Sequence, residues 1–178
     1  MVYAALAISI LALGFTLVSF WWLNARKGTL EATRPPNYAF ANKPELRLRF
    51  PLAFFNTGAK ALIVTDLRVV FDDKPTPSPS RWMTTRTKLR PEEHDGFAFA
   101  TPFSVGGRSA KEVIAEFGDV RGWSLEPLSK YRLRLQAKIH PSEEWTDVVT
   151  FDWWVPPAEK MGLYIAHRNE PYDLPVGD

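Results

Sequence analysis

The sequence predicts an all-β fold, an antiparallel β-sandwich of seven or eight strands, placed after one N-terminal transmembrane helix. The first observation is an uncharged apolar run over residues 2–23 of the 178-residue chain. The second is a series of later segments in which apolar and polar residues alternate with period two, as in half-buried strands. The third is composition, since 15 prolines, 7 tryptophans and 12 phenylalanines are typical of short strands joined by turns.

Residues 2–23 are predicted to form the transmembrane helix. A helix of this length spans about 33 Å, enough to cross a hydrocarbon core of about 30 Å. The alternative, a cleaved signal peptide, requires a basic start and a shorter apolar core, and no Lys or Arg precedes this run. We therefore expect a retained single span that contacts membrane lipid. The residues expected at the two membrane interfaces are Tyr3, Trp21, Trp22, Arg26 and Lys27, the last two within a basic collar over 24–27.

The charge that follows the span indicates its orientation. Residues 24–43 carry four basic side chains and one acidic one. Because basic residues are retained on the cytoplasmic side, this bias favours a β domain in the cytoplasm. The extracytoplasmic side is the alternative, since anchored β-sandwiches often occur there.

The β domain is expected over 28–157, and its first half contains the clearest pair of strands. A short strand within 28–34 ends at Pro35 and Pro36, which cannot donate to a ladder. Strand 46–54 alternates Leu and Phe with Arg, Pro and Ala, and its internal Pro51 requires an edge, a bulge or an amide directed away from a partner. A turn at 56–58 leads to strand 61–71, whose face from Ile63 to Phe71 is expected to be buried. We expect the two strands to form an antiparallel hairpin.

The second half of the domain continues with short strands. After a proline-rich loop at 72–80, strands are expected over 82–89, over 97–99 with 103–105 as its continuation after a break at Pro102, and over 131–139 and 144–155. Segment 109–117 is expected to be a strand, with a helix as the alternative. Trp123 is expected to pin the loop before strand 131–139. Adjacent Trp153 and Trp154 must face opposite ways in a strand, so only one of them enters the core. The C-terminal tail over 158–178 is expected to dock through Met161, Leu163, Tyr164 and Ile165, and to become extended and partly disordered from Asn169 onward.

Composition excludes several function classes. The net charge is +2, so no strong field favours nucleic acid, and no nucleic-acid module is recognisable. The chain has no cysteine, which excludes disulfides, thiolate catalysis, Cys-ligated zinc and iron–sulfur clusters. The three histidines lack the spacing of metal ligands. We expect no cofactor and no catalytic residue.

Basic side chains on the strands are candidate surface contacts. Alternation places them on outward faces, where they could meet anionic lipid or another polyanion. The alternative is an ordinary solvated strand face. The candidate contact residues are Arg47, Arg49, Arg132, Arg134, Lys138 and, as an exposed aromatic anchor, Trp154.

One acidic turn is the candidate for a metal site. Glu92, Glu93, His94 and Asp95 are adjacent and offer oxygen and imidazole ligands. Metal ligands usually come from several elements, so the alternative is a solvated turn.

Two segments resemble known families. FFNTGAKALIVTDLRVVF, over 54–71, resembles bacterial envelope-associated proteins with immunoglobulin-like or fibronectin-like sandwiches, and FATPFSVGGR, over 99–108, is similar to short single-span bacterial proteins. The resemblance implies an immunoglobulin-like sandwich in an anchored, non-enzymatic setting. We therefore expect a membrane-anchored module that binds a protein partner or scaffolds an assembly. The two alternatives are a lipid or polyanion binder that uses the strand arginines, and a membrane-bound metal-dependent enzyme or sensor around His94.

Overall fold

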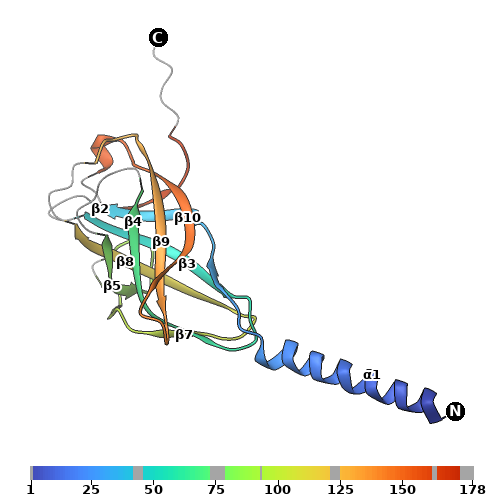
Figure 1. Cartoon of the computed structure of the whole chain (residues 1–178). Coiled ribbons are helices and arrows are strands. Elements are labelled where there is room, and N and C mark those ends of the chain that lie inside the picture. The colour runs from blue at the N-terminus through green and yellow to red at the C-terminus, as the bar shows by residue number, and fades with distance from the viewer. Residues whose placement is uncertain are drawn as a thin grey trace.

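The protein consists of one N-terminal apolar helix and an antiparallel β domain, as a computed structural model describes it (Figure 1). The helix projects from one end of the domain. The described residues are 2–41, 46–72, 79–92, 94–120, 125–161 and 164–172, without the side chains of 119 and 120.

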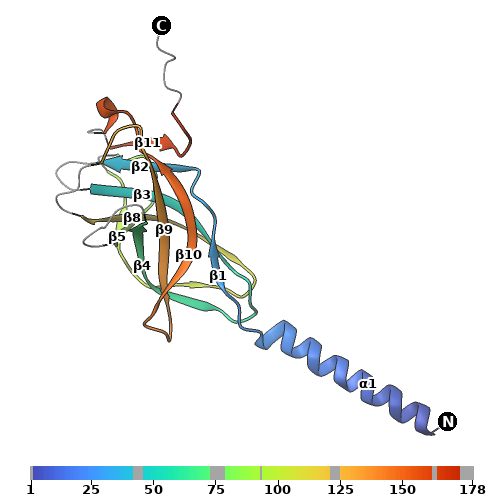
Figure 2. The same cartoon turned by 45° about the horizontal axis from the view of Figure 1, so that its top comes forward.

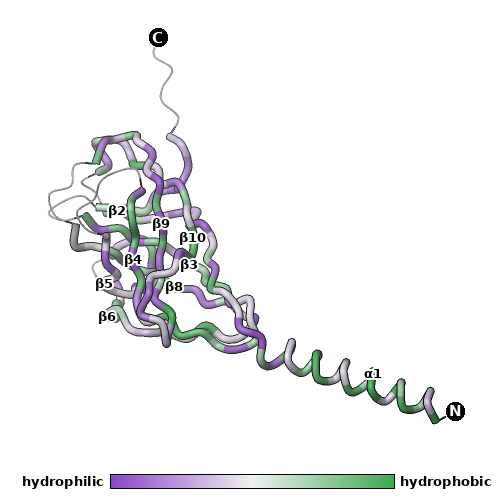
Figure 3. The backbone as a smooth tube through the Cα atoms, in the orientation of Figure 1, coloured by the Kyte–Doolittle hydropathy of each residue, from purple (hydrophilic) through white to green (hydrophobic). Residues whose placement is uncertain are grey.

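The helix has the length and composition of a membrane span. It comprises α1 (Val2–Phe20) and a wider final turn, η1 (Trp21–Ala25), which together form a 24-residue apolar segment. Its large apolar side chains are exposed all round. Figure 3 shows that the residues of this segment are mostly hydrophobic. The helix predicted over 2–23 is confirmed. A signal sequence near an N-terminus shares these properties, so the helix alone does not distinguish the two.

Within the described residues, eleven strands form one antiparallel sheet that curls into a half-barrel (Figure 1). The strands are β1 (Leu30–Ala32), β2 (Asn37–Ala41), β3 (Leu46–Asn56), β4 (Leu62–Phe71), β5 (Ser80–Arg86), β6 (Phe97–Phe99), β7 (Phe103–Val105), β8 (Ala110–Val120), β9 (Lys130–Ile139), β10 (Trp145–Trp154) and β11 (Ile165–Arg168). The order of the sheet is β10-β9-β4-β5-β8-β3-β2-β11, with β1 beside β3, β6 beside β5 and β7 beside β4.

The antiparallel all-β prediction is confirmed, whereas the strand count of seven or eight is wrong. Two short strands, β2 and β11, were not predicted, and they pair with each other. β2 follows the two prolines at 35 and 36, and β11 lies in the predicted tail. Both strands are too short for an alternating pattern to stand out. Their stability comes from partners distant in the sequence, which a local pattern does not reveal.

The predicted hairpin between 46–54 and 61–71 is wrong. β3 pairs with β8, β2 and β1, whereas β4 pairs with β9, β5 and β7. Asn56 turns the chain away from β3, because its Nδ2 donates to the carbonyls of Lys60 at 2.7 Å and Val105 at 3.2 Å. Its Oδ1 also accepts from the Gly58 amide at 2.9 Å, so the turn is a corner and not a two-strand connection.

Pro51 is accommodated within β3 because its nitrogen, which has no N–H to donate, faces a gap between neighbouring strands. β3 pairs with β8 along its whole length, including Pro51 opposite Ile114. On its other edge, Arg49 pairs with Ala39 of β2, and Ala53 accepts from the Thr33 amide after β1 at 3.0 Å. Since Pro51 has the same parity as these two residues, its nitrogen points to the space between β1 and β2. The prediction of an amide directed away from a partner is therefore confirmed.

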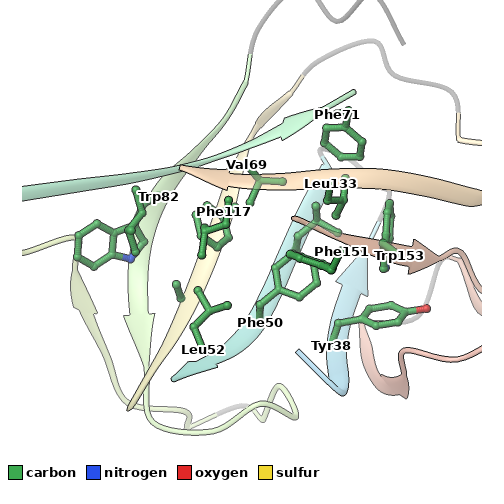
Figure 4. Packing of buried hydrophobic residues seen from close by; sticks show 14 of the residues in the cluster. Tyr38, Phe50, Leu52, Val69, Phe71, Trp82, Phe117, Leu133, Phe151 and Trp153 are labelled. Carbon is green, nitrogen blue, oxygen red and sulfur yellow. The ribbon is translucent and has the colours of Figure 1, made fainter. Parts of the chain in front are cut away.

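The core consists of the inward faces of the sheet (Figure 4). The alternating residues predicted in β3 are all buried, as are those of β9 apart from the half-buried Ile139. Trp153 is fully buried, with its ring centroid 5.3 Å from Phe40 and 5.7 Å from Tyr38, and the next residue, Trp154, faces outward and is half-buried. The opposed orientation predicted for the two tryptophans is confirmed.

A bulge shifts the phase of β4. The register with β9 slips between Val64 and Asp66, so Val64 and Leu67 are buried and Ile63 is 42% exposed. The prediction of a buried Ile63 is wrong, because the predicted face assumed an unbroken period of two. The bulge breaks that period, so Leu67 points inward after it, whereas Val64 and not Ile63 points inward before it.

The C-terminal tail docks on the sheet. After a 3-10 turn, η2 (Ala158–Lys160), Met161 is buried and β11 pairs with β2 from Ile165↔Phe40 to Arg168↔Asn37. The docking prediction is confirmed for the described residues. Asn169 is bonded to the sheet as well, contrary to the expected start of an extended tail. The predictions for Trp123, Leu163 and 173–178 lie outside the described residues.

Candidate functional site

The basic side chains of β9 point outward, as predicted, and they lie beside acids. Arg132 pairs with Asp152 at 3.1 Å, and Lys138 pairs with Glu143 at 3.2 Å. Arg134 bridges Asp72 at 2.8 Å and Asp147 at 3.3 Å. This face is charge-balanced, so it offers less attraction to a polyanion than the basic residues alone suggest.

Arg49 was predicted to be an outward contact, and that prediction is wrong. Only 2% of Arg49 is exposed, although it lies on the outer face of β3. Lys88, Asp95 and Tyr164 cover it: Nη1 donates to Asp95 at 2.6 Å and to the Lys88 carbonyl at 2.8 Å, and the guanidinium lies 5.1 Å from the Tyr164 ring centroid. Its neighbour Arg47 remains partly exposed.

Glu116 of β8 is the centre of this buried charge cluster and is 0% exposed. Tyr164 donates to it at 2.7 Å, Arg86 and Arg49 Nη2 at 2.9 Å each, and Arg47 at 3.4 Å. Burial by itself raises the pKa of Glu116, but hydrogen bonds from Arg86, Tyr164 and Arg49 outweigh it and lower the pKa to about 2. The cluster of Arg47, Arg49, Arg86, Asp95, Glu116 and Tyr164 therefore joins β3, β8 and β5 to the turn at Asp95 and to the tail.

The acidic turn proposed as a metal site has a different arrangement. Asp95 directs its carboxylate at Arg49, while His94 is exposed. Glu92 pairs with Lys88 at 2.6 Å, and Glu93 lies outside the described residues. Within the described ranges, no three His, Asp or Glu side chains converge to hold a metal.

Two aromatic side chains on β6 form an exposed apolar surface. Phe97 is 59% and Phe99 is 77% exposed, and their rings contact each other edge to face with centroids 6.1 Å apart. The Arg86 guanidinium lies 4.9 Å from the Phe97 ring centroid. We name Phe97, Phe99 and Arg86 the β6 surface. The sequence predicted the strand but not the exposure, because Phe-Ala-Phe alternation is also typical of a half-buried strand.

The end of the helix is fixed to the domain by backbone contacts. The Ala59 amide donates to the Arg26 carbonyl at 2.9 Å, the Thr57 amide to the Thr29 carbonyl at 3.1 Å, and the Arg108 guanidinium to the Trp22 carbonyl. Gly28 and Gly58 lie backbone to backbone, so a Cβ on either would clash. We name these three turns, 26–29, 57–60 and 106–109, the helix joint. It makes the helix a firm extension of the domain and not a loose tether.

The predicted interface residues occupy the two ends of this helix. Tyr3, Trp21 and Trp22 are exposed, and the Arg26 guanidinium lies 4.2 Å from the Trp22 ring centroid. Lys27 is exposed one residue before the joint's Gly28.

These features define a class of protein: a curled antiparallel half-barrel joined firmly to one apolar helix, with a buried charge cluster on its outer face. No family model matches the chain, and no curated protein matches it. One solved structure, a protein from Archaeoglobus fulgidus, aligns with 80% of this chain and 96% of its own, at 9% identity and a TM-score of 0.35. That similarity is too low to assign a fold or a function.

Proposed function

We propose that this protein is a single-span membrane-anchored module that binds a protein partner through the β6 surface. The exposure of Phe97 and Phe99 is the observation that carries the proposal. Aromatic side chains beside an arginine are enriched among residues that dominate binding energies, and soluble surfaces seldom leave two adjacent large rings exposed. The immunoglobulin-like arrangement expected from the sequence belongs to the same proposal.

The firm helix joint supports this function. A rigid link presents one face of the domain at a set height above the bilayer, which favours a partner that is itself held at the membrane. In Figure 3, β6 lies on the side of the domain away from α1. Since Phe97 and Phe99 are exposed there, they are accessible to a protein beside the domain.

The experiment is photocross-linking in membranes that contain the full chain. A photoreactive phenylalanine analogue at Phe99, on the face that the two rings share, is expected to form an adduct with one specific protein, and the same analogue at Glu143 is the control position. Phe97→Ser should abolish the Phe99 adduct, whereas Phe55→Ser, at an exposed phenylalanine outside the β6 surface, should not. No adduct at Phe99, or an adduct to lipid alone, would contradict the proposal.

The proposal places the domain on the cytoplasmic side, following the basic residues after the helix. Since the chain contains no cysteine, a single Glu143→Cys variant reports on the sidedness of the domain. A membrane-impermeant maleimide should label it only after the cells are permeabilised. Labelling of intact cells would place the domain outside.

A further inference from the structure

A groove opens at the seam of the half-barrel, next to the helix joint. Figure 2 shows β1 passing from the helix along the side of β10. The groove lies between them with a volume of about 460 Å³, within the range of about 300 to 1,000 Å³ typical of small-molecule sites. Its walls come from 28–31 before and within β1, Leu62 of β4, Ile139 of β9 and 146–148 of β10.

The floor of the groove is apolar and continuous with the core. Leu62, Ile139 and Val148 are only partly buried, yet all three pack against the hydrophobic core cluster. Leu30 of β1 belongs to that cluster and is almost fully buried. An apolar ligand in the groove would therefore cover side chains that water now reaches.

The opposite end of the same seam is closed. Asn169 joins the two sides there, because its Nδ2 donates to the carbonyls of Pro35 at 3.2 Å and Asp152 at 2.9 Å, and its Oδ1 accepts from the Trp154 amide at 3.1 Å. The Tyr38 hydroxyl also donates to the Trp154 carbonyl. The seam is therefore open towards the helix and closed by hydrogen bonds at the far end.

The helix joint fixes the mouth of the groove relative to the helix. Gly28, the first lining residue, is the third residue after Ala25, where the apolar segment ends. The next residue, Thr29, is held by its amide, which donates to Thr57 Oγ1 at 2.9 Å. An occupant that entered from the bilayer would meet apolar side chains immediately beyond the membrane interface.

We infer that the groove binds one acyl chain of a membrane lipid, an inference that rests on the membrane anchoring of the proposed function. The rim carries the carboxylates of Glu31 and Asp147. Asp147 already accepts from Arg134 and Gln136, whereas Glu31 accepts only a long 3.4 Å bond from Thr29 among the contacts of the described residues. Because acids at the rim repel anionic headgroups, a zwitterionic lipid such as phosphatidylcholine fits the mouth best.

The test uses the full chain in phosphatidylcholine vesicles that contain a trace of phosphatidylcholine with a photoreactive diazirine on the acyl chain. After illumination, mass spectrometry should locate label on peptides that cover 28–31 and 139–148, in addition to the apolar helix. Label on the helix serves as the internal reference for incorporation into the bilayer.

Leu62→Trp fills the groove, and Ile63→Trp adds the same ring one position along, on the exposed face of β4. Leu62→Trp should lower groove label about tenfold relative to helix label, whereas Ile63→Trp should change it less than about twofold; tenfold corresponds to about 1.4 kcal/mol. Val148→Trp is a second filling variant, for use if Leu62→Trp unfolds, as judged by tryptophan fluorescence.

The outcomes separate this inference from the proposed function. Label on the helix with none on the groove peptides would overturn the lipid site and leave the anchor intact. Absence of label from the helix as well would overturn the anchor, and with it the proposed function. Equal groove label in Leu62→Trp and Ile63→Trp would show that the label comes from elsewhere, which also overturns the inference.

Discussion

Replacing Glu116 by Gln tests whether the buried charge cluster holds the outer face of the sheet together. The substitution keeps the shape of the side chain and one oxygen acceptor, but it removes the negative charge. Arg49, which is 2% exposed, would then face a neutral amide whose NH2 group competes with its own donors. Arg49 keeps its ion pair with Asp95 at 2.6 Å but loses its second carboxylate, and Arg86 loses the carboxylate that faces it at 2.9 Å.

The expected loss of stability is about 3 kcal/mol. Removing one partner of a buried ion pair costs about 3 to 5 kcal/mol. The displacement of the Glu116 pKa from 4.5 to about 2 corresponds to about 3 kcal/mol, which solvent at the partly exposed Arg47 and Arg86 reduces to some extent. We therefore take the lower end of the range.

The same substitution should change the response to acid. Because the pKa of Glu116 is lower in the folded than in the unfolded chain, its contribution is fully present above pH 4.5 and is lost as the pH falls from 4.5 towards about 2. In Glu116→Gln this part of the acid sensitivity should disappear. The free energies of unfolding of the original chain and of the variant should therefore converge as the pH falls.

The assay is guanidinium unfolding of the full chain in detergent, followed by tryptophan fluorescence, since Trp153 is fully buried in the core. Glu112→Gln is the matched control, an exposed glutamate on the same strand, and should change stability by less than about 0.5 kcal/mol. If Glu116→Gln costs no more than Glu112→Gln, the cluster does not stabilise the fold in the way its geometry indicates.

Three further predictions concern the joint, the seam and the tail. Gly58→Ala should destabilise the domain by about 1 to 3 kcal/mol, because the added Cβ would lie 2.5 Å from the Gly28 Cα. In the control Gly14→Ala, the added Cβ in the helix meets no atom within 4 Å, so the unfolding midpoint of the β domain should be unchanged. Asn169→Ala should lower the free energy of unfolding by about 1 to 3 kcal/mol and accelerate hydrogen exchange of the Trp154 amide, since three backbone groups lose a partner. Glu170→Ala, at an exposed residue, is the control, and exchange in Asn169→Ala that is as slow as in this control would contradict the closed seam. Burial, and secondarily Lys160, lowers the pKa of His167, so folding favours the neutral ring and stability should decline as the pH falls below 6.5. In His167→Phe, the unfolding midpoints measured from about pH 8 to about pH 5 should no longer show this part of the decline. An unaltered pH dependence in the variant would refute this role of His167.

Local pattern was a sound guide to the elements and to the inner face of the sheet. Strand 46–54 became β3 with its apolar residues buried, because the two-residue period of a strand depends only on backbone geometry. The opposed faces of Trp153 and Trp154 followed from the same period. Pro51 was interpretable too, since a residue without an N–H group must point that side of its backbone away from a ladder.

The local sequence pattern does not predict which strands pair or which outward side chains are covered by other segments. Arg49 alternates as an outward residue, and it is buried because Lys88, Asp95 and Tyr164, distant in the chain, lie over it. Nothing in Phe97-Ala98-Phe99 distinguishes an exposed strand from a covered one, because coverage depends on what packs above it.

The amino-acid sequence is sufficient to predict an apolar segment long enough to cross a bilayer, followed by strands whose inward faces can close a core. Which strands are neighbours, which outward charges are buried, and that the seam beside β1 stays open next to the helix emerge only from the folded domain. Periodicity is set within a few residues, whereas pairing and burial depend on contacts between segments such as 28–31 and 146–148, more than a hundred residues apart.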